Sequence, residues 1–107
     1  MSAIEIFRLR PGQWLLYQVR AADAGISESL VARIRRGDGA QASDLEIELR
    51  TETGGMLSRG RIAIDSGYLA VLREVRRQIA SAGTWQGGDI ELALIDAPKH
   101  AGRLQAT

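Results

Sequence analysis

The chain has 107 residues, of which 45% are hydrophobic and 25% charged, values that indicate one globular domain and exclude a wholly disordered protein. The formal net charge is +1, so no strong overall field directs the protein to nucleic acid or to a membrane surface. The absence of cysteine excludes disulfides, thiolate zinc sites and cysteine nucleophiles, and it fits a cytoplasmic protein. No apolar run approaches the roughly 18 residues that cross a bilayer, and the N-terminus lacks a secretory signal pattern, so we expect no membrane contact.

Two apolar segments, 3–10 and 13–20, flank Pro11-Gly12, a pair typical of a type II turn. The arrangement predicts a β-hairpin, with a short helix through 13–22 as the alternative. Counting from the turn places Ile4, Ile6, Leu15, Tyr17 and Val19 on one face, and Phe7, Leu9, Trp14 and Leu16 on the other. Both faces are apolar and need cover, so the second face is a candidate partner-binding patch.

After a connection over 21–29, the segment 30–36 fits two structures. Ser27 could cap a helix that ends before Gly37, whereas Leu30, Ala32 and Ile34 alternate with other residues as in a strand. A loop over 37–43 follows it. The next segment, 44–50, alternates strictly between charged and aliphatic side chains and is the clearest strand in the chain.

Cross-strand pairing favours the strand for 30–36. Pairing Ile34 with Ile47 brings Arg35 opposite Glu46, so the aliphatic side chains share one face and opposite charges meet on the other. The same register places Ala32 opposite Leu49 and Arg33 opposite Glu48.

Gly54-Gly55 is a two-residue hairpin signal that joins 44–50 to a strand over 57–64. Placing the turn at these glycines pairs Ile47 with Ile62, Leu45 with Ile64, and Glu48 with Arg61. It also places Arg50 opposite Arg59, where like charges are unfavourable. Either the neighbours Glu48 and Glu52 offset this pair diagonally, which we prefer, or the two arginines bind an anion.

A helix is predicted over 67–82, capped by Asp65-Ser66 and ended by Gly83. Its apolar stripe consists of Tyr68, Leu72, Val75 and Ile79. Leu69 and Ala82 widen this stripe. Arg73, Arg76 and Arg77 lie off the stripe, toward solvent. A turn that contains Trp85 leads to a last strand over 89–96, with Ile90, Leu92 and Leu94 on one side.

These elements predict an α+β fold: an antiparallel meander of about five to six strands packed against one main α-helix, followed by a last strand. We expect a single domain over 1–96 and a flexible C-terminal tail over 97–107.

The residue pattern carries no signal for catalysis. The only histidine, His100, falls in the predicted tail, and no second histidine or cysteine completes a zinc set. Gly37-Asp38-Gly39 resembles a fragment of a calcium loop but lacks the remaining acidic positions, so we interpret it as a turn. Glu46 and Glu48 have arginine partners, which favour the ionised carboxylates and not a general acid. We expect no enzyme, no cofactor and no metal.

Arginine accounts for nearly all basic residues, since Lys99 is the one lysine, and this allows an anion-binding or nucleic-acid-binding hypothesis. Its candidate residues are Arg50, Arg59, Arg73, Arg76 and Arg77, with Phe7, Trp14 and Tyr17 as stacking platforms. The run 56–65, followed by the helix, resembles the single-stranded-DNA-binding fold of the positive-cofactor-4 type. That resemblance covers about thirty residues and implies a strand meander ending in a helix that mediates dimers. The chain departs from it by its strand after the helix and by its lack of lysines.

The hypothesis we prefer is a non-catalytic protein-interaction module, a regulator or inhibitor that binds a partner protein. A homodimer through Phe7, Leu9, Trp14 and Leu16 is one form of it. Single-stranded nucleic-acid binding is the second choice.

Overall fold

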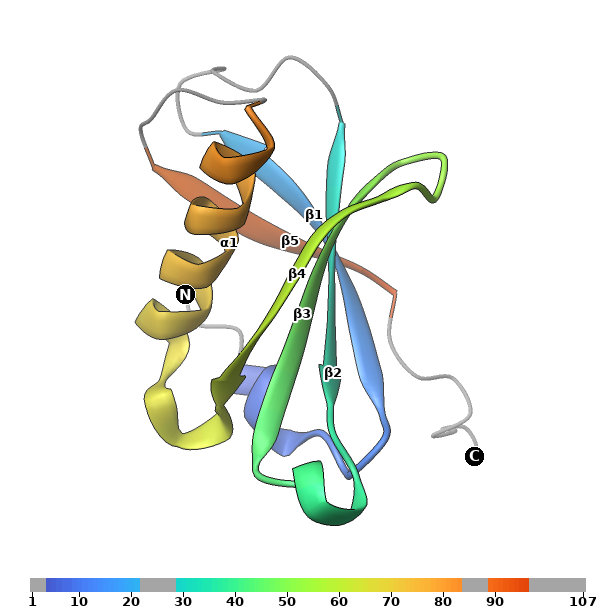
Figure 1. Ribbon diagram of the computed structural model, residues 1–107, viewed down its shortest axis with the longest axis vertical. Helices are drawn as coiled ribbons and strands as arrows, with labels where there is room; N and C mark the ends of the chain where they lie inside the picture. Colours follow the sequence, from blue (N-terminus) through green and yellow to red (C-terminus); the bar gives the residue numbers. More distant parts are fainter. Residues whose placement is uncertain (1–3, 22–28, 84–88, 97–107) are drawn as a thin grey trace.

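The computed structural model of the protein describes residues 4–21, 29–83 and 89–96 (Figure 1). Five strands form one antiparallel sheet in the order β4-β3-β2-β1-β5, and one main helix packs on it, which confirms the predicted α+β class. The elements are η1 (Ile4–Arg8), β1 (Trp14–Ala21), β2 (Leu30–Arg36), η2 (Gly39–Gln41), β3 (Asp44–Thr51), β4 (Met56–Ala63), η3 (Ile64–Ser66), α1 (Tyr68–Ala82) and β5 (Ile90–Asp96). The predicted flexible tail over 97–107, most of the 21–29 connection and the turn at Trp85 lie outside the described residues.

The predicted first hairpin is wrong, because Ile4–Arg8 forms the 3-10 helix η1 and not a strand. The strand β1 has β2 on one side and β5 on the other, so no edge remains for residues 3–10 to pair with. Instead η1 folds beneath α1 at the lower end of the sheet (Figure 1), where Ile6 and Leu9 are buried in the core. The apolar side chains of this segment are thus removed from water without a hairpin. The alternative of a helix through 13–22 is also wrong, since Trp14–Ala21 is a strand.

The central pairing is the one expected from the sequence. In β2 and β3, Ile34 pairs with Ile47, Arg35 with Glu46, and Arg33 with Glu48. The segment 30–36 is therefore a strand, and the alternative of a helix there is wrong.

The predicted register between β3 and β4 is wrong by two residues. Leu45 pairs with Ile62 and Glu48 with Arg59, so Arg50 lies opposite Met56 and the expected conflict between Arg50 and Arg59 does not arise. The cause is the turn. The Gly54 N–H donates to the Thr51 carbonyl at 3.0 Å, which puts Glu52 and Thr53 at the tip and Gly54 in the left-handed region at φ 104°. The loop is longer than a two-residue turn, while the two-residue shift keeps every side chain on its predicted face.

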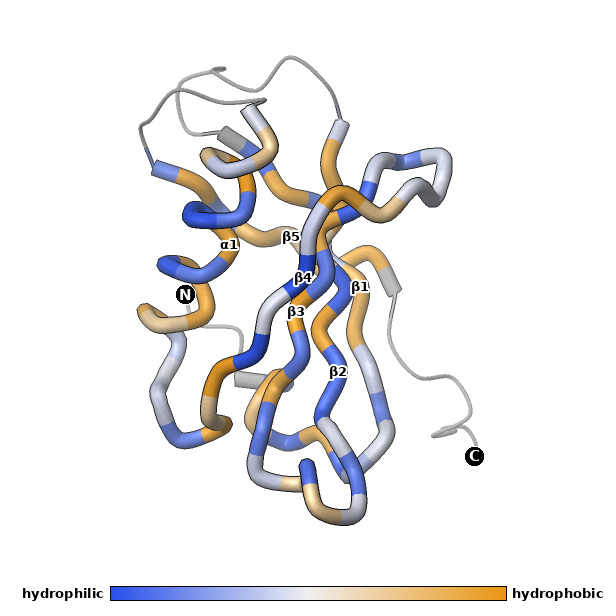
Figure 2. Tube along the Cα trace, viewed as in Figure 1, coloured by the Kyte–Doolittle hydropathy of each residue, from blue (hydrophilic) through white to orange (hydrophobic). Residues whose placement is uncertain are grey.

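One face of the sheet, called the inner face below, carries the core. The helix α1 packs against β3, β4 and β5, while Ile6 of η1 and Leu9, which follows it, join the same core. The strands β2 and β3 alternate between hydrophilic and hydrophobic residues (Figure 2), as one covered face requires. Burying each large aliphatic side chain contributes about 1.5–3 kcal/mol relative to its exposure. The strand residues of the core are Leu15, Tyr17, Val19, Leu30, Ala32, Ile34, Leu45, Ile47, Leu49 and Ile90.

The helix follows its prediction in length but not fully in its buried stripe. It begins one residue later than expected, Gly67 rather than Asp65 or Ser66 occupies the N-cap position, and Gly83 ends it in the left-handed conformation. Val71, Val75, Gln78 and Ile79 are buried, whereas Leu69 is 73% exposed. The inclusion of Leu69 in the stripe was therefore wrong, and a polar residue, Gln78, lies in the core instead.

Candidate functional site

The face of the sheet opposite α1, called the outer face below, is the first candidate surface. Its side chains follow from the registers because directly paired residues share a face. They are Trp14, Leu16, Gln18 and Arg20 of β1, Val31, Arg33 and Arg35 of β2, Asp44, Glu46, Glu48 and Arg50 of β3, Arg59, Arg61 and Ala63 of β4, and Glu91 and Ala93 of β5. Every described helix contributes to the core on the inner side or lies in a loop, so no described element crosses this face.

The middle of the outer face is a row of ion pairs around two carboxylates. Glu48 accepts from Arg33 at 3.4 Å and from Arg50 at 3.0 Å. Glu46 lies 3.9 Å from Arg35 and 4.0 Å from Arg59. Each carboxylate thus serves two guanidinium groups, and the arginines exceed the glutamates on this face.

An apolar corner adjoins this row on β1. The guanidinium of Arg33 lies over the Trp14 ring, 5.4 Å from its centroid, in a cation–π contact. Leu16 pairs directly with Arg33, and both Trp14 and Leu16 are partly exposed. The corner therefore combines an aromatic ring, an aliphatic side chain and a guanidinium whose position is fixed from two sides.

The three helix arginines do not form one cluster. Arg73 and Arg76 line a groove of about 420 Å³ between α1 and the start of β5, together with Leu69, Leu72, Asp89 and Ile90. Arg77 lies apart from this groove, donating to Glu74 at 2.6 Å and 3.0 Å beside Gly60 of β4. The hydrogen bond from Arg77 lowers the pKa of Glu74 below its ordinary value.

The side chain of Glu74 also takes part in a buried contact between helix and sheet. Gln78 is fully buried, and its amide nitrogen donates to the Ile47 carbonyl at 3.0 Å and to Glu74 at 2.8 Å. An added Cβ at Gly60 would meet the Glu74 carboxylate, so the absence of a side chain there admits this polar contact. The cluster fixes α1 on the sheet.

The four residues of the predicted partner patch are separated. Leu9 is buried and Phe7 packs against the core, while Trp14 and Leu16 remain on the outer face. The proposed stacking platforms are separated as well. Tyr17 is buried on the inner side and donates to Glu5 at 2.7 Å, and burial together with this bond raises the pKa of Tyr17.

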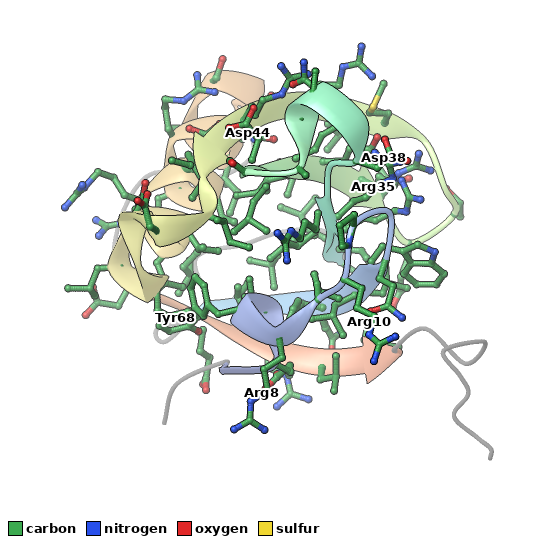
Figure 3. The ribbon with its side chains drawn as sticks, turned by 90° about the horizontal axis from the view of Figure 1, so that it is seen from below. Arg8, Arg10, Arg35, Asp38, Asp44 and Tyr68 are labelled. Atoms are coloured by element: carbon green, nitrogen blue, oxygen red, sulfur yellow. The ribbon has the colours of Figure 1, made fainter. Side chains whose placement is uncertain are left out.

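Sequence reasoning missed the outer face as a surface in its own right, although its signal was present. The pairing of β2 with β3 already put all their charges on one side, and a single helix covers only one face of a sheet. Figure 3 shows the end of this surface, where Arg35 and Asp38 lie next to each other. Tyr68 lies on the opposite side of the molecule. The Arg35–Asp38 distance is 3.6 Å.

Chemistry-bearing groups are sparse in the part of the chain that the structure describes. Residues 4–21, 29–83 and 89–96 contain no group of three or more metal-ligating side chains, and none of their helices is long and apolar enough to cross a membrane. A smaller cavity of about 80 Å³ lies near Arg35, Asp38 and Arg61. This volume suits a few waters better than a substrate.

Comparison of the chain with protein-family models, curated proteins and solved structures gives no significant match.

Proposed function

We propose that this protein is a non-catalytic protein-interaction module that binds an acidic partner through the outer face of its sheet. The observation that carries the proposal is the contrast between the two faces. Among the described elements, the packing layer lies on the inner side, while Trp14, Leu16 and a surplus of arginine lie on the other. A regulator or inhibitor that acts by occupying a partner needs no more chemistry than this.

The residue types at the apolar corner suit such a role. Tryptophan and arginine are the residues that most often dominate binding energy at protein interfaces. Arg33 is held by Trp14 on one side and by Glu48 on the other, so little side-chain freedom remains to be lost on binding. The neighbouring ion pairs contribute less to affinity than to the choice and orientation of the partner.

The charge of the surface favours a different protein over a second copy. By register, six arginines share this face with four carboxylates: Arg20, Arg33, Arg35, Arg50, Arg59 and Arg61 against Asp44, Glu46, Glu48 and Glu91. A two-fold dimer through this face would bring two cationic surfaces together, and like charges across an interface are unfavourable. An acidic partner removes that repulsion, so the homodimer becomes the less favoured form of the hypothesis.

Single-stranded nucleic acid remains the second candidate, because Trp14 and several arginines share the outer face. Successive bases require successive stacking platforms. Trp14 is the one aromatic residue on this face among the described residues, and its ring already contacts Arg33. Arg73, Arg76 and Arg77 belong to the helix layer and would not act with it.

The proposal is tested by replacing Trp14→Asp and measuring capture of partner proteins by the tagged protein from cell extract. The matched control is Leu69→Asp, the same kind of change on the exposed side of α1. We expect an acidic protein that the wild type and L69D retain and W14D loses. Capture that W14D leaves unchanged contradicts the proposal.

Two further measurements separate the alternatives. Light scattering of the wild type and W14D measures the molar mass in solution. A dimeric wild type and a monomeric W14D would identify a second copy of the chain, and not an acidic protein, as the partner. Salt-dependent retention on a single-stranded oligonucleotide column, lost in W14D, would favour nucleic acid instead.

A further inference from the structure

The strand β4 is one of the two edges of the described sheet, and it pairs with β3 alone. An edge strand presents backbone N–H and C=O groups that a further extended chain can pair with. In β4, residues 56–63, this edge is continuous with the arginine-rich side of the outer face. It lies three strand spacings, about 15 Å, from the Trp14 corner on β1.

One hydrogen bond determines which alternate residues of β4 direct their backbone groups toward β3 and which direct them toward the free edge. The Ile64 N–H donates to the Ser43 carbonyl at 2.8 Å, so counting in twos makes Ile62 and Gly60 the residues that exchange backbone bonds with β3. The backbone groups of Arg59 and Arg61 then point to the free edge. Ala63 has the same parity, so two of the three β4 residues counted here as able to bond an added strand carry guanidinium groups.

The two guanidinium groups are not fully used within the described residues. Arg59 lies at 4.0 Å from Glu46, and its side chain is 62% exposed. Arg61 pairs with Glu46 in the register, is exposed, and has no ion pair among the described residues. A strand added to β4 would place residues directly opposite both arginines, as β3 does on the other side with Glu48 and Glu46.

Self-pairing through this edge is unfavourable. Backbone bonds at Arg59 and Arg61 allow three central two-fold registers, which oppose Arg59 to itself, Arg59 to Arg61, or Arg61 to itself. Each register places like charges directly opposite, which destabilises a strand pair. The edge thus rejects a second copy of β4 while it favours a strand of the opposite charge.

From these observations we infer that β4 is a docking edge for an extended acidic segment of a partner protein, which adds a sixth strand antiparallel to β4. The segment carries two acidic residues two positions apart, opposite Arg59 and Arg61. The inference goes beyond the proposed function, since it concerns the backbone edge of β4 and strand addition rather than docking on the Trp14 corner of the outer face, although Arg59 and Arg61 belong to both. Because the corner lies on β1, either can fail without the other.

The test is a titration of the ¹⁵N-labelled protein with a synthetic peptide of alternating glutamate and valine, followed by NMR. Matched peptides carry glutamine or lysine in place of glutamate. We expect saturable shifts at the amides of Arg59, Arg61 and Ala63, with slower hydrogen exchange at these amides. Two opposite-charge pairs predict an affinity about 2- to 30-fold higher for the glutamate peptide than for the glutamine peptide.

Variants of the protein locate the contact. R59Q and R61Q together should reduce the preference for glutamate to within about 2-fold, while R73Q with R76Q, an equal change of charge on α1, should leave it intact. W14A should also leave it intact, which separates this site from the outer-face corner. Circular dichroism melts check that each variant is folded.

Three results would overturn the inference: no shift at β4 with millimolar peptide, equal affinity for the lysine peptide, or shifts confined to the groove beside Arg73.

Discussion

The two faces of the sheet are built from the same strands but are stabilised by different physics. On the inner face, aliphatic side chains such as Ile34 and Ile47 are completely buried beneath α1 and η1. On the outer face, the same strands present arginines and glutamates in pairs at 3.0–4.0 Å, most of them partly exposed. Burial is worth several times more than a partly solvated ion pair. The inner face therefore accounts for most of the stability.

The largest effect is expected from Ile34→Ala, which removes a fully buried side chain at the centre of the sheet. Loss of burial and the cavity left behind predict a destabilisation of about 2–5 kcal/mol in urea unfolding. Leu16→Ala, on the neighbouring strand but the outer face, should cost about 1 kcal/mol or less. If I34A does not fold, Ile34→Val should cost about 0.5–1.5 kcal/mol. Equal losses for the two faces would remove the distinction between them.

The next largest effect is expected from Gly60→Ala, which tests the contact between α1 and the edge of the sheet. The added methyl group would meet the Glu74 carboxylate, which Arg77 and Gln78 hold in place. Overpacking of this kind predicts a destabilisation of about 1–3 kcal/mol. In the double variant G60A with Glu74→Ala, the loss due to the methyl group should largely disappear. A G60A variant as stable as the wild type would show that the helix can move away at no cost.

On the outer face, Glu48→Gln is expected to cost about 1 kcal/mol. Glu48 is 7% exposed and bridges Arg33 and Arg50, so its neutralisation leaves two guanidinium groups beside an uncharged amide. The double variant E48Q with Arg50→Gln should recover part of the loss. A loss that does not change between low and high salt would argue against an electrostatic origin.

The sequence could predict what depends on alternation and charge pairing, and it failed where a segment had a choice of neighbours. The register of Ile34 with Ile47 followed from two agreeing patterns, one aliphatic and one charged. Residues 4–8 carry no such constraint, since their apolar side chains fit a strand or a helical turn equally well. Only the competition for the edges of β1, which β2 and β5 occupy, decides between them.

The same reasoning explains the fate of the candidate site. Trp14 and Leu16 keep their predicted face because β1 alternates, whereas Phe7 and Leu9 depended on a hairpin that does not form. The predicted β3–β4 register differs from the observed one by two residues, because the tip of a turn is set by local hydrogen bonds, such as that from the Gly54 N–H to the Thr51 carbonyl. Side-chain periodicity is blind to a shift of two.

The smallest predicted effect is the pH dependence of stability due to the ion pair between Glu74 and Arg77 on α1, on the inner side of the sheet. The hydrogen bond from Arg77 lowers the folded-state pKa of Glu74 below the ordinary 4.5. The resulting stabilisation is complete above the unfolded-state pKa and is lost as the pH falls through the lower folded-state value. We expect the smallest contribution of those considered, because Arg77 is largely exposed and solvent screens the pair.

The measurement is urea unfolding of the wild type and Glu74→Gln at neutral pH and at successively lower pH values. The stability difference between the two proteins should shrink as the pH falls below 4.5, since the protonated Glu74 and the amide are then nearly equivalent. A wild type that is less stable than Glu74→Gln at neutral pH, with the deficit vanishing on acidification, would mean that burial disfavours the ionised carboxylate. The helix layer, unlike the outer face, would then not depend on ionised pairs.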